Sequence, residues 1–524
     1  MKSRLSYCLI AGVLILSIFL GIFIWRNQHL KETPKFHEQT FKTPISTKYI
    51  PKNADLVFHW KINPTLMPEY IEKINKNITS QKIKFIRDSS FNLISLDYIN
   101  EISEWIGNYG SFAIFDSNKN FLNDWLIVAE KQSDVNIDEK IALTVEEETT
   151  NQSSEKTNNL NISKEKIFSK KINFNKYIYF AIDKDIILIS SNKKVIRSSI
   201  NQPEDYISNT KEKYKEIKFQ SAINDGMFLL EISPRKILSL TEDKENTLGL
   251  NQANKLISSI NFDKNQLELE GVVAYKNKTE MPSNELNNNL IDIKKAFKSF
   301  TDCILIDNPK QYFGKTSKHP YQNLIKSIIK ESTASDFSKL FKIILENSKG
   351  NLIWINDKNW LILTSKSETS KTEINNLLRE DDFLNSSLEF KNKNLEIWSK
   401  ISTNDNDNYE IKENVEAIIE ENEGRYIWSQ NLSSISRFDE KIYLGKNLKQ
   451  EHEIDEIHNF NDILRINIGK EKAKIILNNF YPYILFQSML GNKLKSPQNI
   501  ELSISVPNIN YSDFIKFKIK LKTS

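Results

Sequence analysis

The stretch from Tyr49 to Leu66, YIPKNADLVFHWKINPTL, constrains the fold of this chain more than any other segment. Apolar and polar residues alternate along it, with apolar residues at Leu56, Phe58, Trp60 and Ile62. A period of two is typical of a strand with one buried face, so we expect His59 to point away from the core and to be exposed. We expect Asn63-Pro64 to begin a helix, because a proline at the first helical position loses no hydrogen bond that the helix needs.

Elements of the first half of the chain recur in the second half. GSFAIF (110–115) is followed by WLIVA (125–129), and GNLIWI (350–355) is followed by WLILT (360–364), each pair across a polar turn. We interpret this recurrence as a diverged internal duplication. Because each hairpin has an apolar face that another layer must cover, the sequence predicts the α+β class, with antiparallel sheets and helices packed on one face.

Two further hairpins are predicted from alternating runs on either side of short polar turns. Tyr177–Ile182 and Ile186–Ser190 flank the turn Asp183-Lys184-Asp185, and Ile257–Phe262 precedes Leu267–Tyr275. We expect the two carboxylates of that first turn to be turn residues and not a catalytic pair.

The N-terminal run Leu5–Trp25 has 21 residues without a charge. A helix of that length spans about 30 Å, the thickness of the hydrocarbon core of a bilayer. Lys2 and Arg4 precede the run and Arg26 follows it. A cleaved signal peptide would carry small residues at its cleavage site, which Phe23-Ile24-Trp25 does not offer, so we expect an uncleaved anchor.

This anchor sets the expected localisation and domain order. We expect a single-pass membrane protein with a cytoplasmic N-terminus and the bulk of the chain outside the cytoplasm, in the plasma or thylakoid membrane. The predicted divisions are a short tail (1–4), a transmembrane anchor (5–25), a tether (26–48), a first α+β domain (49–280) with a mobile polar insert (145–166), and a second α+β domain (290–524).

Composition excludes some classes of protein. Lysine and arginine total 72 against 68 acidic residues, and no basic block stands out, so we expect no nucleic-acid partner. Cys8 and Cys303 are too few and too far apart in the sequence for a disulfide framework. Hydrophobic residues make up 39% of the chain, which is enough for packed cores.

Three stretches resemble ligand-binding motifs, namely Gly314–Ser317 (a phosphate loop), Asp405–Asn408 with Glu416 (a calcium loop), and His452 with His458 (a metal pair). Each departs from its motif. Pro309 stands where a phosphate loop needs glycine, and Glu410 stands where a calcium loop needs the glycine of its sharp turn. Two histidines six residues apart face different sides of a helix. We therefore expect no catalytic residue, no cofactor and no metal, and we expect the protein not to be an enzyme.

Cys303 lies in an apolar run suited to a buried strand, so we do not expect it to be a nucleophile. The tryptophans of the predicted strands and helices are expected to belong to the core: Trp60, Trp105, Trp125, Trp354, Trp360, Trp398 and Trp428.

The anchor, the tether, the opening stretch YIPKNADLVFHWKINPTL, the segment WIGNYGSFAIF and the hairpin YIYFAIDKDIILISSNKKVI together resemble one known family. It is a cyanobacterial family of membrane-anchored proteins with a domain of unknown function, marked by a P-x-x-A…N-P opening and a W-[IL]-G segment. The resemblance is clearest over residues 49–275. It implies a place in the cell and an architecture, and no catalytic residue.

Three functional hypotheses follow. The first is a membrane-anchored structural or interaction protein outside the cytoplasm, which contacts the lipid bilayer through residues 5–25 and binds an unknown protein of the envelope or thylakoid lumen. The second is a binding module that holds a hydrophobic, lipid or glycan ligand between the two halves. The third is a hydrolase with an unrecognised site.

Overall fold

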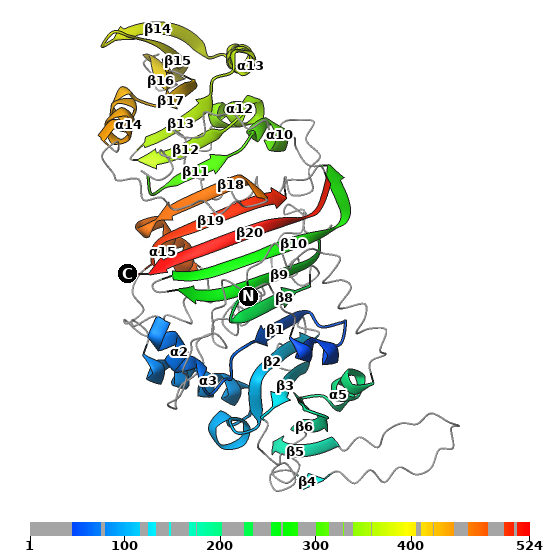
Figure 1. The fold of residues 1–524 in the computed structure, drawn as a ribbon. Helices are drawn as coiled ribbons and strands as arrows, with labels where there is room; N and C mark the ends of the chain where they lie inside the picture. Colours follow the sequence, from blue (N-terminus) through cyan, green and yellow to red (C-terminus); the bar gives the residue numbers. More distant parts are fainter. Residues whose placement is uncertain are drawn as a thin grey trace.

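The computed structural model describes residues 44–74, 79–115, 124–132, 146–147, 167–173, 176–201, 225–233, 253–263, 266–280, 300–313, 329, 339–357, 359–404, 410–422, 424–444, 460–479, 497–507 and 511–523. Twenty strands within these residues form one antiparallel sheet (Figure 1). Helices cover parts of it on both faces (Figure 1).

The first ten strands, called the first repeat, are β1 (Leu56–Trp60), β2 (Ile106–Phe115), β3 (Asp124–Lys131), β4 (Glu146–Glu147), β5 (Ile167–Asn173), β6 (Lys176–Asp183), β7 (Ile186–Ser190), β8 (Phe228–Ile232), β9 (Ala253–Asp263) and β10 (Gln266–Glu280). The next ten, called the second repeat, are β11 (Cys303–Ile306), β12 (Leu352–Asp357), β13 (Asn359–Ser365), β14 (Leu384–Phe390), β15 (Lys393–Asn404), β16 (Glu410–Asn422), β17 (Arg425–Ser429), β18 (Phe460–Gly469), β19 (Pro497–Pro507) and β20 (Tyr511–Thr523).

The helical elements of the described residues are η1 (Ile45–Tyr49), α2 (Met67–Ile74), α3 (Ser80–Leu93), η2 (Tyr98–Ile102), α5 (Lys193–Ile200), α10 (Pro309–Phe313), α12 (Lys339–Asn347), α13 (Glu368–Glu380), α14 (Leu432–Leu444) and α15 (Lys470–Asn479). Of these, η1 is a 3-10 helix and η2 is a π-helix.

The strand pairings give both repeats the same order. The first repeat runs β4-β5-β6-β7-β3-β2-β1-β8-β9-β10. The second runs β14-β15-β16-β17-β13-β12-β11-β18-β19-β20. The repeats join where β10 pairs with β20, from Gln266 opposite Lys522 to Glu280 opposite Tyr511. Among the described strands, β4 and β14 therefore form the two ends of one continuous sheet.

One row of register partners crosses the whole sheet on a single face, because side chains of directly opposite residues share a face. The row is Ile167, Ala181, Leu188, Val128, Ser111, His59, Leu229, Ser259, Glu270, Lys518, Ser503, Arg465, Leu305, Ile353, Leu363, Ile427, Glu420, Leu395 and Leu388. We call this the His59 face, and we call the opposite face the Trp60 face.

Helices pack on both of these faces. On the Trp60 face, α2 and α3 bury Ile71 and Ile83 against the first repeat, and α12 buries Ile344 against the second. On the His59 face, Ile196 of α5 packs against the first repeat and Phe438 of α14 against the second. Figure 1 shows α2 and α3 on one side of the first repeat and α5 on the other.

These observations correct the predicted fold class. The α+β prediction placed helices on one face of separate antiparallel sheets, after a transmembrane helix. The sheet is instead one body, and its helices cover both faces. The strands of residues 49–280 and 290–524 share that sheet. The division of these residues into two domains stays a prediction.

The predicted membrane span is also corrected. No helix in the part of the chain that the structure describes is long and apolar enough to cross a bilayer. The single-pass localisation is therefore not supported. The run Leu5–Trp25, on which that prediction depended, lies outside the described residues.

The predicted hairpins are confirmed, since β2 pairs with β3, β6 with β7, β9 with β10 and β12 with β13. The prediction that the opening strand buries only one of its faces is wrong, because all five residues of β1 are buried. Close packing explains why a glycine lies in β2. A Cβ atom at Gly110 would lie 2.0 Å from Cζ2 of Trp60, so only glycine leaves room for the indole ring.

Candidate functional site

None of the three motif-like stretches of the sequence can be placed in a site, because the structure does not describe them. Gly314–Ser317, Asp405–Asn408 and the pair His452 and His458 lie outside the described residues. Within the described residues, no group of three or more His, Cys, Asp or Glu side chains could hold a metal ion. Asp183 accepts a hydrogen bond of 2.9 Å from the Tyr49 hydroxyl beside the turn of the β6–β7 hairpin.

The predicted core residues are buried. Cys303 is 1% exposed in β11, and its thiol donates a weak hydrogen bond to the carbonyl of Phe300 at 3.4 Å. Burial raises the pKa of this thiol far above its usual range, which keeps it protonated. Six of the seven predicted core tryptophans are buried, and Trp360 is partly buried: Trp60, Trp105, Trp125, Trp354, Trp398 and Trp428.

His59 lies at the centre of a buried polar network that the sequence analysis did not predict. Its Nδ1 atom lies 2.6 Å from Oγ of Ser111, and Ser111 in turn contacts Oγ of Ser46 in η1. Its Nε2 atom lies 3.4 Å from Oε1 of Glu231, whose other oxygen pairs with Lys255. Strands β2, β1, β8 and β9 contribute Ser111, His59, Glu231 and Lys255 in that order, and η1 packs against β2 through the contact of Ser46 with Ser111.

Burial sets the charges of this network. It lowers the pKa of the His59 imidazole, and the neighbouring Glu231 opposes that effect only in part. Burial alone would raise the pKa of Glu231, but the charge of Lys255 and the contact with His59 outweigh it and hold the pKa at about 2. The network therefore holds a neutral imidazole beside an ionised carboxylate.

A serine, a histidine and a glutamate in this order are the residue types of a hydrolytic triad. A nucleophile must also meet its substrate, and Ser111 and His59 are both 0% exposed. In this arrangement the network can hold η1 against the sheet through the contact of Ser46 with Ser111. A second buried pair, Lys61 with Asp225, lies nearby between β1 and the start of β8, where Asn261 donates a hydrogen bond to the Asp225 carbonyl.

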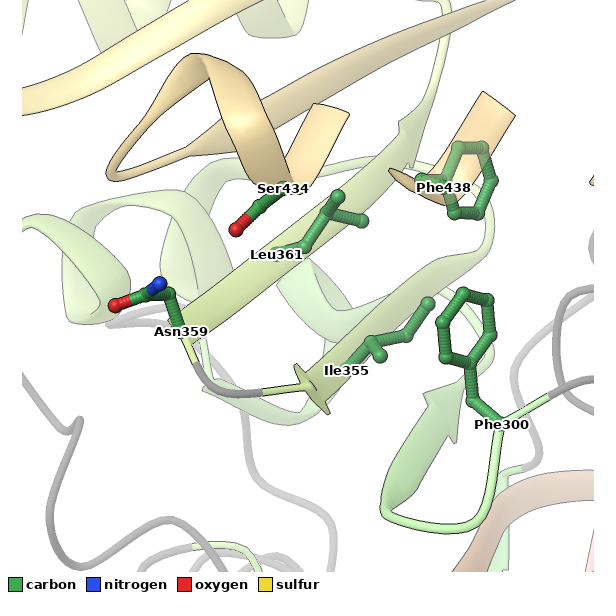
Figure 2. A pocket seen from close by; sticks show the side chains of 6 residues that line it. All are labelled: Phe300, Ile355, Asn359, Leu361, Ser434 and Phe438. Carbon is green, nitrogen blue, oxygen red and sulfur yellow. The ribbon is translucent and has the colours of Figure 1, made fainter. Parts of the chain in front are cut away.

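A small cavity lies in the second repeat, between α14 and the strands β12 and β13. Figure 2 shows its lining, in which two phenylalanine rings face each other at one end: Phe300, Ile355, Asn359, Leu361, Ser434 and Phe438. The two rings stack at 5.9 Å between centroids. The cavity has a volume of about 10 Å³, which holds about one water molecule. It does not lie between the repeats, and the ligand-binding hypothesis stays a prediction.

The end of the sheet at β14 is open. Strands β14, β15 and β16, which we call the terminal ribbon, form this end of the sheet (Figure 1). In β14 every residue is exposed except Phe390, which is partly buried. Within the described residues β14 pairs on one side only, with β15. Its other edge therefore presents backbone N–H and C=O groups to solvent.

Large apolar side chains gather on one face of the terminal ribbon. Five of them are between 39% and 71% exposed: Leu384, Leu388, Ile401, Ile411 and Val415. Ser399 faces both Leu384 and Val415 in register, and Leu388 continues the row of the His59 face, so alternation places all five on that face. On the opposite face, α13 packs Ile374 and Leu378 in the same cluster as Trp398.

A family model described as "Protein of unknown function (DUF3352)" matches residues 8–521. The chain belongs to the DUF3352 family. A family of unknown function is what the resemblance implied, and this part of it is confirmed, whereas its cyanobacterial origin stays a prediction. No curated protein matches the DUF3352 chain.

The solved structures that are similar to this DUF3352 chain include two crystal forms of TP0453. Form I is 10% identical with a TM-score of 0.22, over 48% of this chain and 85% of that one. Form IV is also 10% identical with a TM-score of 0.22, over 44% and 81%. At that score the likeness carries no argument about function.

The sequence of this DUF3352 protein carries a signal for the terminal ribbon that our predictions did not use. LNSSLEF and LEIWSKI alternate apolar and polar residues on either side of Lys391-Asn392. Both of these turn residues have positive φ, 51° and 59°, as a two-residue hairpin turn requires. The pattern predicts the hairpin, but it does not say which edge of the hairpin stays unpaired.

Proposed function

We propose that this DUF3352 protein is a non-enzymatic interaction protein that binds a partner protein through its terminal ribbon. The observation that carries the proposal is the open edge of β14, a seven-residue strand with an exposed apolar face beside it. Natural proteins protect such edges with short strands, lysine, proline or bulges. The strand LNSSLEF contains one charged residue, Glu389, and neither lysine nor proline, and its register with β15 has no bulge.

The two ends of the sheet differ, which favours β14 as the binding end. At the other end, within the described residues, β4 spans two residues, Glu146 and Glu147, a length that offers little backbone for pairing. The two repeats share one strand order, so the long strand at the β14 end is a feature of that end and not of the repeat.

The proposed binding mode is strand addition. A partner in extended conformation pairs its backbone with β14 and lays alternate apolar side chains on the His59 face of the ribbon, beside Leu384 and Leu388. Each leucine or isoleucine side chain that is fully buried in this way contributes about 1.5–3 kcal/mol. The exposed apolar side chains thus supply affinity, and the backbone edge fixes the register.

Photocrosslinking in cells tests this function. A photoreactive amino acid replaces Leu388 in the ribbon, and in a matched control it replaces Phe85, which is 61% exposed on α3. We expect position 388 to form a recurrent crosslink to a protein chain, identified by mass spectrometry, and position 85 to form none above background. Equal and non-specific labelling from both positions would contradict the proposal that the terminal ribbon is the binding surface.

A further inference from the structure

The geometry points to a second copy of this chain as the partner, with the two β14 strands paired antiparallel about a two-fold axis at Ser387. This inference rests on the proposed binding role of the terminal ribbon. It extends that role by naming the occupant of the open edge and the register. A two-fold contact between identical strands is self-complementary and must be antiparallel.

The register follows from the length of β14. Only pairing centred on Ser387 uses all seven residues of Leu384–Phe390 in each copy. In that register Leu384 stands opposite Phe390 of the second copy, and both lie on the His59 face, where they bury apolar surface together. The charged residue of the strand, Glu389, then meets the amide of Asn385 and not its own copy.

Charges at the two ends of β14 select the antiparallel arrangement. Asp382 precedes the strand and Lys391 follows it, and both residues bend the chain with positive φ. In the antiparallel register centred on Ser387, Asp382 of one copy stands opposite Asn392 of the other and is a diagonal neighbour of Lys391, so opposite charges lie near each other. Parallel pairing would instead set Asp382, Glu389 and Lys391 each against its own kind.

The space beside β14 is open to a second copy. Helix α13 packs on the Trp60 face of the ribbon, yet Asn385, Ser387 and Glu389, which point to that face of β14, are all exposed. The helix therefore stops short of the edge strand. A seven-residue edge buries less than the roughly 1,200–2,000 Å² of stable interfaces, so we expect a monomer–dimer equilibrium that depends on concentration.

Sedimentation velocity of the purified full chain over a concentration series tests the inference, with circular dichroism to verify folding. Because Ser387 faces itself across the axis, Ser387→Lys and Ser387→Glu each place like charges opposite each other and should abolish the dimer. An equimolar mixture of the two variants should restore it, which no folding defect can do. The matched control, Ser198→Lys on the exposed side of α5, should associate as wild type does.

A chain that stays monomeric at sub-millimolar concentration would overturn the inference. A dimer that survives both single substitutions would overturn it as well, because the contact would then lie elsewhere. The proposed binding role of the terminal ribbon can hold even if the dimer does not form. If the chain is monomeric but position 388 crosslinks to a different protein in cells, the terminal ribbon remains the binding surface and only the identity of the partner is wrong.

Discussion

His59 is neutral in the folded protein because burial removes water from its imidazole. The sequence predicts an exposed His59, because the alternation of β1 shows only that this side chain faces away from Trp60. It does not show that η1 covers that second face. Ser111 and Glu231 come from β2 and β8, far from His59 in the sequence, so no local pattern could have assembled the network.

The buried imidazole predicts a pH dependence of stability. Because the pKa of His59 lies below 6.5 in the folded state, only the unfolded chain takes up this proton as pH falls below that value, and stability falls with it. Glu231, with its folded pKa of about 2, loses its contribution only as pH falls from 4.5 toward 2. Asp307, whose pKa burial raises to about 6, takes up a proton in the folded protein over the same interval and acts in the opposite direction. The difference between wild type and a variant without His59 therefore isolates the histidine between pH 7 and pH 5.

Urea denaturation at pH 7 and pH 5 measures this effect. We expect wild type to lose up to about 2 kcal/mol of unfolding free energy between the two pH values through His59. His59→Asn keeps a hydrogen-bonding group near Ser111 and does not titrate, so its stability should change less with pH, even if it is lower at pH 7. An identical pH dependence in both proteins would contradict the assignment.

At the scale of elements, the junction between β10 and β20 holds the two repeats in one sheet. On its His59 face Lys516 pairs with Glu270 and Lys518 with Glu268, each at 2.5 Å. Glu270 is 3% exposed, so its charge depends on a paired cation. At the edge of the same region Lys522 pairs with Glu501 at 2.6 Å, but the two side chains are 45% and 33% exposed.

Removing one lysine at a time separates these two pairs. We expect Lys516→Met to cost about 3 kcal/mol of unfolding free energy, because it leaves Glu270 buried without this cation. Adding Glu270→Gln should recover much of that loss. The exposed control Lys522→Met should cost less than about 1 kcal/mol. Equal losses from both lysines, measured by urea denaturation, would contradict a supporting role for the buried pair.

Local elements were more predictable than their assembly. The β6–β7 and β9–β10 hairpins were predictable because each turn and its alternating flanks lie together in the sequence. The counterpart of the opening unit was missed, although Asn308-Pro309 follows β11 as Asn63-Pro64 follows β1. The junction of β10 with β20 could not be predicted, since it pairs segments from opposite halves of the chain.

At the scale of the whole molecule, the two repeats form a long sheet with unequal ends. One end is the two-residue strand β4, and the other is the terminal ribbon with its exposed β14 edge. The sequence offered no way to predict this asymmetry, because an edge strand and a central strand share the same alternation. In the function that we propose, the open edge of β14 accepts another strand.

Hydrogen exchange of the full chain, followed by mass spectrometry, tests this claim most directly. Peptides that cover Leu384–Phe390 should exchange fast in dilute protein. They should gain protection in concentrated protein, or when a partner identified by crosslinking is added, because an added strand bonds the outward amides. Peptides from the central strand β17 should not change. If β14 exchanges at the same rate under every one of these conditions, the open edge is not the binding surface.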